Sequence, residues 1–190
     1  MLEVTFLPFP LLYTQRLVLR QITRQDAKEI LNLRSNDLVM QFIGRPKMTS
    51  VQEAESWIEK FDISLAQQEG INWAISLKGN NTLLGTIGFW RLEKEHFRAE
   101  IGYLLNPDFQ GKGIMNEAFE PVLNYGFEKM KLHSIMANVY PENKSSIRLL
   151  EKNGFQQEGY FRENYFHDGV FTDTSVFSLV MDNADQNITN

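Results

Sequence analysis

Hydrophobic positions recur along the chain at two spacings, and the change from one spacing to the other predicts the order of the elements. Short runs of alternating apolar residues are typical of strands, and they cover residues 16–20, 71–77, 83–92, 99–105, 134–140, 156–166 and 170–181. Apolar residues that step by three and four are typical of amphipathic helices, and they cover residues 23–36, 50–65, 113–131 and 143–152. This order predicts an α/β (mixed α+β) fold, with a central, mostly antiparallel sheet and helices on its faces.

Local signals refine the connections between these elements. Ser50 with Glu53 forms a capping box at the start of the second helix. Residues 38–48 hold a Gly and a Pro and lack periodicity, so they are expected to form an irregular loop. Pro121 lies inside the long central helix, so we expect a kink or an early end near Glu117.

Length, composition and charge narrow the class of protein. The chain has 190 residues, 43% of them hydrophobic, and a formal net charge of −5. We expect one domain over residues 1–190, with an extended arm at 1–15 and a polar tail at 182–190. The acidic balance argues against nucleic acid as a partner, and the lack of a signal peptide or apolar span favours a cytoplasmic protein with no membrane partner. Zero cysteines and three scattered histidines exclude thiolate catalysis and give no metal-ligand pattern, so no metal is expected.

The segment from Gln110 to Met115 lies between a predicted strand and the central helix, and it carries two glycines one residue apart. Such a turn brings backbone close to a ligand, and the following helix presents free N–H groups and a partial positive charge. We therefore interpret Gln110, Gly111, Lys112, Gly113, Ile114 and Met115 as a phosphate cradle. A dinucleotide fingerprint would need glycine at Asn116, and a Walker loop would need glycine at Asn106, so neither motif fits.

The strand before the cradle has two different faces. Ile101, Tyr103 and Leu105 share one face, whereas Glu100 and Leu104 lie on the other. Glu100 can therefore face a cleft instead of the core, as a base or as an attractor of a cationic amine. The alternative is an ordinary ion pair with Arg91 or Arg98.

Taken in order, these segments resemble the GNAT superfamily of acetyl-CoA-dependent N-acetyltransferases, within it the ribosomal-protein N-terminal acetyltransferases. The resemblance covers about residues 14–181 and is carried by 14–20, 99–103, 110–115, Asn138, 143–146, 149–155 and 159–163. Two departures are Met115, where the family has a small residue, and Pro121 in the central helix.

The resemblance implies a GNAT fold with a splayed strand pair and a ligand held largely by backbone. The cradle would bind the pyrophosphate of acetyl-CoA, and Lys112 could add charge. The pantetheine arm would pair like an added strand with Tyr103, Leu104 and Leu105. Asn138, Asn143 and Ser146 would also contact the cofactor, and Asn143 could equally cap the following helix.

Direct attack of an amine on the thioester needs three groups. We assign the oxyanion donor to the backbone N–H of Leu104. Ser146 matches the family's serine at the leaving sulfur, although a first-turn serine can simply bond backbone. Glu100 is the first candidate for the base, and Glu163 is the second.

The acceptor is predicted as a primary amine, and the resemblance favours a protein N-terminal α-amine, such as that of a ribosomal protein. An α-amine has a pKa near 7.7–8.0 and needs a weaker base than a lysine-like amine. The alternatives are a polyamine, an amino acid or an aminoglycoside, or a non-catalytic acyl-CoA sensor. A monomer or a homodimer is expected.

Overall fold

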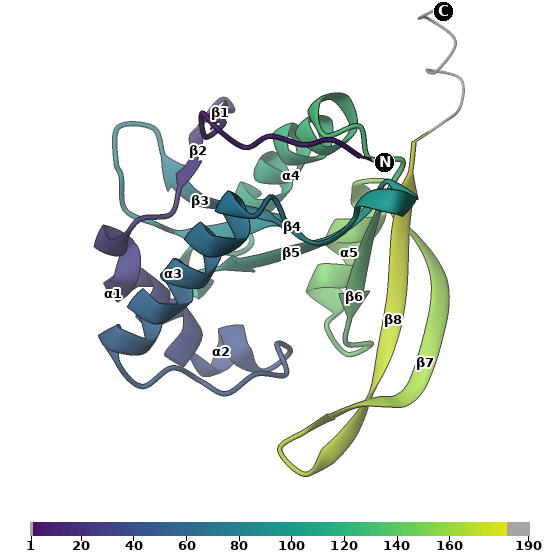
Figure 1. Ribbon diagram of the computed structural model, residues 1–190. Coiled ribbons are helices and arrows are strands. Elements are labelled where there is room, and N and C mark those ends of the chain that lie inside the picture. Colours follow the sequence, from purple (N-terminus) through teal and green to yellow (C-terminus); the bar gives the residue numbers. More distant parts are fainter. Residues whose placement is uncertain (1, 182–190) are drawn as a thin grey trace, which may run out of the picture.

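A central eight-stranded sheet dominates the computed structural model, which describes residues 2–181 (Figure 1). The strands are β1 (Leu12–Tyr13), β2 (Leu17–Gln21), β3 (Ile71–Leu77), β4 (Gly85–Glu93), β5 (Arg98–Leu105), β6 (Ser134–Val139), β7 (Gln156–His167) and β8 (Val170–Val180). Their spatial order is β1-β2-β3-β4-β5-β6-β8-β7. All neighbours are antiparallel except β5 and β6, which run parallel. The mostly antiparallel mixed sheet is therefore confirmed.

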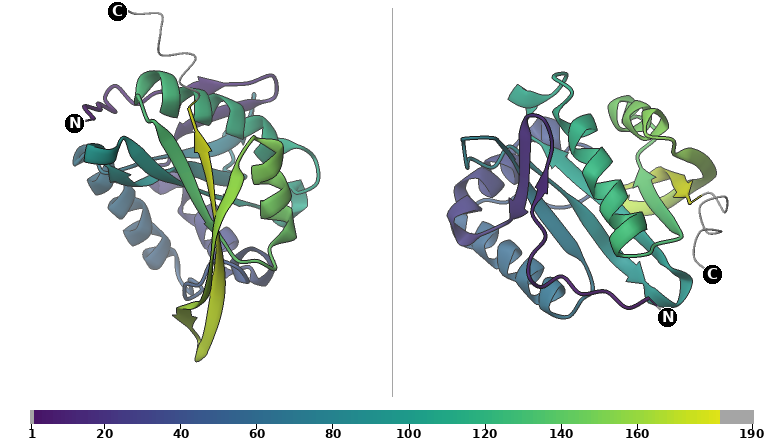
Figure 2. Two further views of the ribbon diagram at one scale, coloured as in Figure 1. Left: turned by 90° about the vertical axis from the view of Figure 1, so that its right-hand side faces the viewer. Right: turned by 90° about the horizontal axis from the view of Figure 1, so that it is seen from above.

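Helices cover both faces of this sheet (Figures 1 and 2). They are α1 (Ala27–Ser35), α2 (Asp37–Met40), α3 (Val51–Ala66), α4 (Ile114–Asn124) and α5 (Lys144–Lys152), with a π-helical turn at Tyr125–Lys129 and short 3₁₀ turns at Arg24–Asp26, Lys94–His96 and Pro107–Phe109. The apolar stripe of α4 packs with the strands and α5 into one core cluster. The stripes of α1 and α3 form a second cluster with Ala74 and Leu83. The spacing in the sequence therefore located the buried faces correctly.

The central helix continues through Pro121, so the expected early end near Glu117 is wrong. Pro121 removes one backbone donor, but Ala118, Phe119 and Val122 around it are fully buried. This burial stabilises the helical turn more than the lost hydrogen bond destabilises it. The change in helical period comes later, in the π-helical turn.

The loop at 38–48 and the extended arm at 1–15 each contain a short regular element that was not predicted. The loop at 38–48 begins inside the short helix α2, because the Asn36 side chain accepts hydrogen bonds from the amides of Leu38 and Val39. The arm before β2 contains β1 and is fixed to the body by buried Leu2 and Phe6. A four-residue helix and a two-residue strand are too short to leave a periodic pattern.

The predicted polar tail at 182–190 is beyond the described residues. Among residues 2–181, every helix is too short or too polar to cross a membrane.

Candidate active site

The predicted cradle forms a tight turn that delivers the chain into α4. Gly111 and Gly113 both have left-handed backbone, with φ of +69° and +74°. Gly113 is the N-cap residue and supplies no capping side chain, so the first amides of α4 are left for a ligand. A Cβ at Gly111 would meet nothing within 4 Å, and one at Gly113 would meet Arg16 at 3.5 Å. The backbone here is open to close approach by an anion.

Arg16 and Glu117 hold this turn against β2. The Arg16 guanidinium donates to Glu117 at 2.6 Å and to the Lys112 carbonyl at 3.1 Å. The Thr14 hydroxyl and the Arg16 amide donate to the same carboxylate, at 2.5 and 2.8 Å. Partial burial alone would raise the pKa of Glu117, but these hydrogen bonds outweigh it and lower that pKa. The cradle is therefore supported by an ionised carboxylate inside the first turn of α4.

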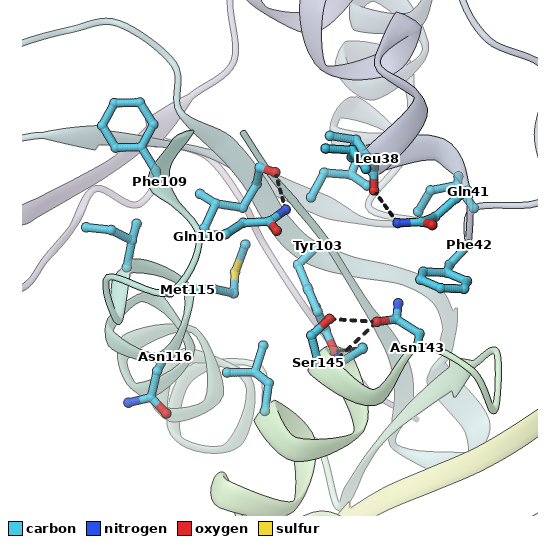
Figure 3. Close-up of a pocket in the computed structure, with 18 of the residues that line it drawn as sticks. Leu38, Gln41, Phe42, Tyr103, Phe109, Gln110, Met115, Asn116, Asn143 and Ser145 are labelled. Atoms are coloured by element: carbon cyan, nitrogen blue, oxygen red, sulfur yellow. Dashed lines mark hydrogen bonds between the residues drawn. The ribbon is translucent and has the colours of Figure 1, made fainter. Parts of the chain in front are cut away.

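A first cavity of about 290 Å³ opens beside the cradle (Figure 3). It lies between the end of β5, the α2 segment and the start of α5. Ten of the residues predicted to bind the cofactor line it: Tyr103, Leu104, Leu105, Gln110, Gly111, Gly113, Ile114, Met115, Asn143 and Ser146. Lys112 does not, and its ammonium lies 5.4 Å from the Phe109 ring centroid. Asn138 lies outside this cavity, in the second one.

The splayed strand pair joins the first cavity to the second. Strands β5 and β6 pair at three positions, from Arg98–Ser134 to Glu100–Met136, and then separate. A second cavity of about 550 Å³ opens on the other side of the gap, and both cavities are lined by Tyr103, Leu104 and Ser146. A long ligand in the first cavity can thus present one end to a second ligand through the gap.

The register of β5 corrects one assignment. Asn106 donates to the Leu84 carbonyl on the β4 side, and the Phe97 carbonyl accepts from His133 on the β6 side. Since backbone groups alternate along a strand, the Leu104 N–H points toward β4, opposite Thr86. Leu104 is therefore wrongly placed to serve as the oxyanion donor. The N–H groups of Tyr103 and Leu105 point into the gap, a direction that residue types cannot reveal.

Glu100 lies at the point where the strands separate, on the face predicted for it. Its side chain is buried and lines the second cavity. Burial raises the pKa of Glu100, opposed by the Asn138 amide and by Arg91, whose guanidinium lies 3.0 Å away. The predicted alternative, an ion pair with Arg91, thus coexists with a carboxylate suited to accept a proton. Glu163, the second candidate, is exposed on the β7–β8 hairpin and lines neither cavity.

Ser146 is linked to Tyr103 by a contact that sequence reasoning missed. The two hydroxyl oxygens lie 2.5 Å apart. Burial raises the pKa of Tyr103 to about 12, so its hydroxyl stays protonated and can donate to Ser146. Asn143 caps α5 by accepting from the Ser146 amide at 3.1 Å, which confirms the capping alternative. Ser146 is therefore fixed through both its backbone and its side chain.

One loop and two helices contribute walls to the second cavity. Phe42, Ile43 and Arg45 contribute from the loop after α2. The Tyr160–Phe171 hairpin lines neither cavity, and its Tyr165 instead donates to the Gly44 carbonyl at 2.9 Å to support that loop. The opposite wall comes from helices α1 and α3, through side chains that sequence reasoning did not select: Arg34, Trp57, Lys60 and Phe61. An aromatic pair spaced by four on α3 was the one signal available.

Comparison with known proteins decides the family. A model of the acetyltransferase (GNAT) domain matches residues 16–156. The chain belongs to the GNAT family. The uncharacterized N-acetyltransferase YoaA of Bacillus subtilis is 42% identical over 172 residues, which cover 90% of this chain and 97% of the relative. The protein is thus an acetyltransferase enzyme, and its two cavities belong to a GNAT domain.

Relatives of this GNAT domain with named acceptors fall into two groups. A spermidine N(1)-acetyltransferase of Vibrio cholerae is 28% identical over 143 residues, covering 75% of this chain and 80% of the relative. The ribosomal protein uS5-alanine N-acetyltransferase of Escherichia coli is 36% identical, but over 77 residues, 40% of each chain. These relatives are thus named for two kinds of acceptor, a polyamine and a ribosomal protein.

Solved structures match the GNAT fold over almost its whole length. A GNAT-family acetyltransferase from Bacillus anthracis is 30% identical with a TM-score of 0.79, covering 90% of this chain and 98% of that one. The Vibrio cholerae spermidine N-acetyltransferase, solved with CoA and spermine, is 27% identical with a TM-score of 0.77, covering 86% and 95%. The predicted fold is confirmed.

Proposed function

We propose that this protein is a cytoplasmic, acetyl-CoA-dependent acetyltransferase of protein N-terminal α-amines. The observation that supports this most is the junction of the two cavities at Tyr103 and Ser146. One cavity contains a phosphate cradle and the other contains a buried carboxylate. This arrangement suits a long thioester on one side and an amine on the other.

The first cavity fits the diphosphate and pantetheine arm of acetyl-CoA. The glycine turn leaves room at the start of α4, and the fold places strand-edge groups of Tyr103 and Leu105 along the gap. Acetyl-CoA supplies the activated acetyl group. We transfer the oxyanion role from Leu104 to one of these two amides, because both point to where the thioester would enter.

The proton transfers are assigned to two side chains. Glu100 accepts the ammonium proton, directly or through water, so that the amine attacks as a neutral nucleophile. The Ser146 hydroxyl, held in place by a hydrogen bond from Tyr103, gives a proton to the departing sulfur and takes one in return from the amine nitrogen, which loses it as the amide forms. A thiol pKa near 8.5 makes this second demand modest.

The α-amine assignment rests on basicity and on the lining of the second cavity. Among residues 2–181, Glu100 is the one carboxylate lining the second cavity, and no histidine lines it. An α-amine, with its pKa near 7.7–8.0, is partly neutral at physiological pH, whereas a polyamine resembles lysine at about 10.4. A polyamine also carries several charges, for which this cavity has a single carboxylate that already pairs with Arg91.

The test is acetyl transfer to matched peptides, followed by detection of free thiol. A short peptide beginning with alanine or serine should be acetylated faster than the same peptide with a blocked N-terminus and one lysine. Equal or reversed rates, or a preference for spermidine, would contradict the assignment. If no amine releases CoA above background although CoA binds, a non-catalytic acyl-CoA sensor becomes the better description.

Removing the two hydroxyl groups should reveal their order of action. Ser146→Ala is expected to lower kcat roughly tenfold with little change in KM for acetyl-CoA, since the thiol is a fair leaving group. Tyr103→Phe keeps the ring against Phe119 and should lower kcat by about three- to tenfold. The double variant should be no slower than Ser146→Ala, because Tyr103 acts through Ser146. Additive losses in steady-state kinetics would show that Tyr103 acts separately.

A further inference from the structure

The second cavity carries more positive charge than the attack of an amine requires. Three basic side chains line it, Arg34 from α1, Arg45 from the loop after α2 and Lys60 from α3. Within the described chain, Glu100 is the single carboxylate in the same lining, and it is paired with Arg91. An excess of cations in a site for a cationic amine needs an explanation.

Arg34 is the most unusual member of this group. Its guanidinium lies 5.0 Å from the Trp57 ring centroid, and its Nε atom is buried without a hydrogen-bond partner among residues 2–181. Within that range, no carboxylate lies within ion-pair distance of it. Burial lowers the pKa of Arg34, and the nearby charge of Arg45 lowers it further. A partly buried guanidinium beside a like charge is costly unless an anion joins it.

Arg34, Arg45 and Lys60 together therefore form a positively charged site suited to an anion. The Trp57 ring lies within cation–π distance of the Arg34 guanidinium and limits its movement, and a guanidinium can donate two parallel hydrogen bonds to a carboxylate. Arg45 and Lys60 are exposed cations that line the same cavity, and they add electrostatic attraction for an anion bound at Arg34. The part of the cavity at Glu100, where the amine would bind, carries negative charge.

We propose that the acceptor carries a carboxylate close to its reactive amine, and that Arg34, assisted by Arg45, binds this carboxylate. The inference rests on the proposed function and specifies its acceptor class. On a protein N-terminus, the carboxylate is an acidic side chain near the first residue. The same chemistry is offered by a free amino acid, and the experiment separates these two sources.

The experiment compares peptides that begin Ala-Asp, Ala-Asn and Ala-Lys, with amidated C-termini, alongside free aspartate and spermidine. For the wild-type protein, kcat/KM should follow the order Asp, Asn, Lys, with Asp exceeding Asn roughly tenfold, the usual effect of a charge-assisted hydrogen bond. In an Arg34→Gln/Arg45→Gln variant, the Asp-to-Asn ratio should fall to within about twofold of one. High salt should reduce the same ratio in the wild type.

Controls distinguish loss of the anion site from misfolding and from failure of the proposed function. Lys78→Gln removes an exposed charge outside both cavities and should leave the ratio as in the wild type. Unchanged CoA affinity in the double variant would show that its first cavity is intact. Peptides acetylated without an Asp preference, or a preference that survives the double variant, would overturn the anion site but leave the proposed function standing. Faster acetylation of aspartate, lost in the double variant, would support the anion site and overturn the N-terminal assignment.

Discussion

Replacement of Gly113 by aspartate is expected to raise the dissociation constant for CoA at least about a hundredfold, the cost of one or two lost charge-assisted hydrogen bonds. The new carboxylate would lie at the start of α4, where the diphosphate is expected to sit. It would satisfy the free amides itself and repel the ligand. Isothermal titration with CoA measures the effect directly.

The chain offers a matched control for backbone strain. Gly79 also has left-handed backbone, with φ of +79°, and a Cβ there would meet nothing within 4 Å. It lies in an exposed turn outside both cavities, so Gly79→Asp should bind CoA like the wild type. Both variants should melt within a few degrees of the wild type, because both turns are exposed. A Gly113→Asp protein that binds CoA normally would place the diphosphate elsewhere.

Glu100→Gln is expected to lower kcat/KM by about 10²-fold or more, the usual contribution of a general base. Glutamine keeps the shape of the side chain but cannot accept the ammonium proton. Glu93→Gln is the matched control, because Glu93 pairs with Arg98 at the surface of the same two strands and lines neither cavity. Steady-state rates of the two variants should therefore differ by roughly two orders of magnitude. Equal rates would remove Glu100 from the mechanism.

The pH profile provides a second signature of Glu100. Because burial raises its pKa, the wild-type rate should fall as the pH drops through that raised value and the base becomes protonated. In Glu100→Gln this limb should disappear and leave the limb that belongs to the amine. A profile unchanged in shape would assign the limb to another group.

The same pKa shift has a consequence for stability. A carboxyl group with a raised pKa in the folded chain is ionised more readily in the unfolded chain, so at neutral pH its charge destabilises the folded state. Arg91 is more than half exposed and offsets this cost weakly. Glu100→Gln should consequently melt at the same temperature as the wild type or higher at pH 7, while losing activity.

The fold was largely predictable because its elements are long and amphipathic. Residues 50–65 and 113–131 each showed one apolar face, and those faces are the ones buried. The predictions failed where a single capping residue or tertiary packing determined the local structure. Asn36 caps a helix of four residues, and the buried neighbours of Pro121 hold its turn together.

The site was predictable where chemistry depends on residue type or strand face. The glycines of the cradle and the orientation of Glu100 are of this kind. Alternation along β5 shows that neighbouring backbone N–H groups point to opposite sides of the strand. Which side faces β4 and which faces β6 depends on the sheet topology, which the sequence pattern does not give. The oxyanion role was therefore wrongly assigned to Leu104. The hydrogen bond between Tyr103 and Ser146 joins residues 43 positions apart, and no periodicity reports it.

The short pairing of β5 with β6 divides the sheet into two parts, β1 to β5 and β6 to β8. Three residue pairs connect the strands on one side with β6, β8 and β7 on the other. A ligand that pairs with the open edges would join these parts, so hydrogen exchange of amides in β6 and the free end of β5 should slow when CoA is added. The cosubstrate would then be a missing strand of the fold, and the protein would fold most cooperatively when loaded.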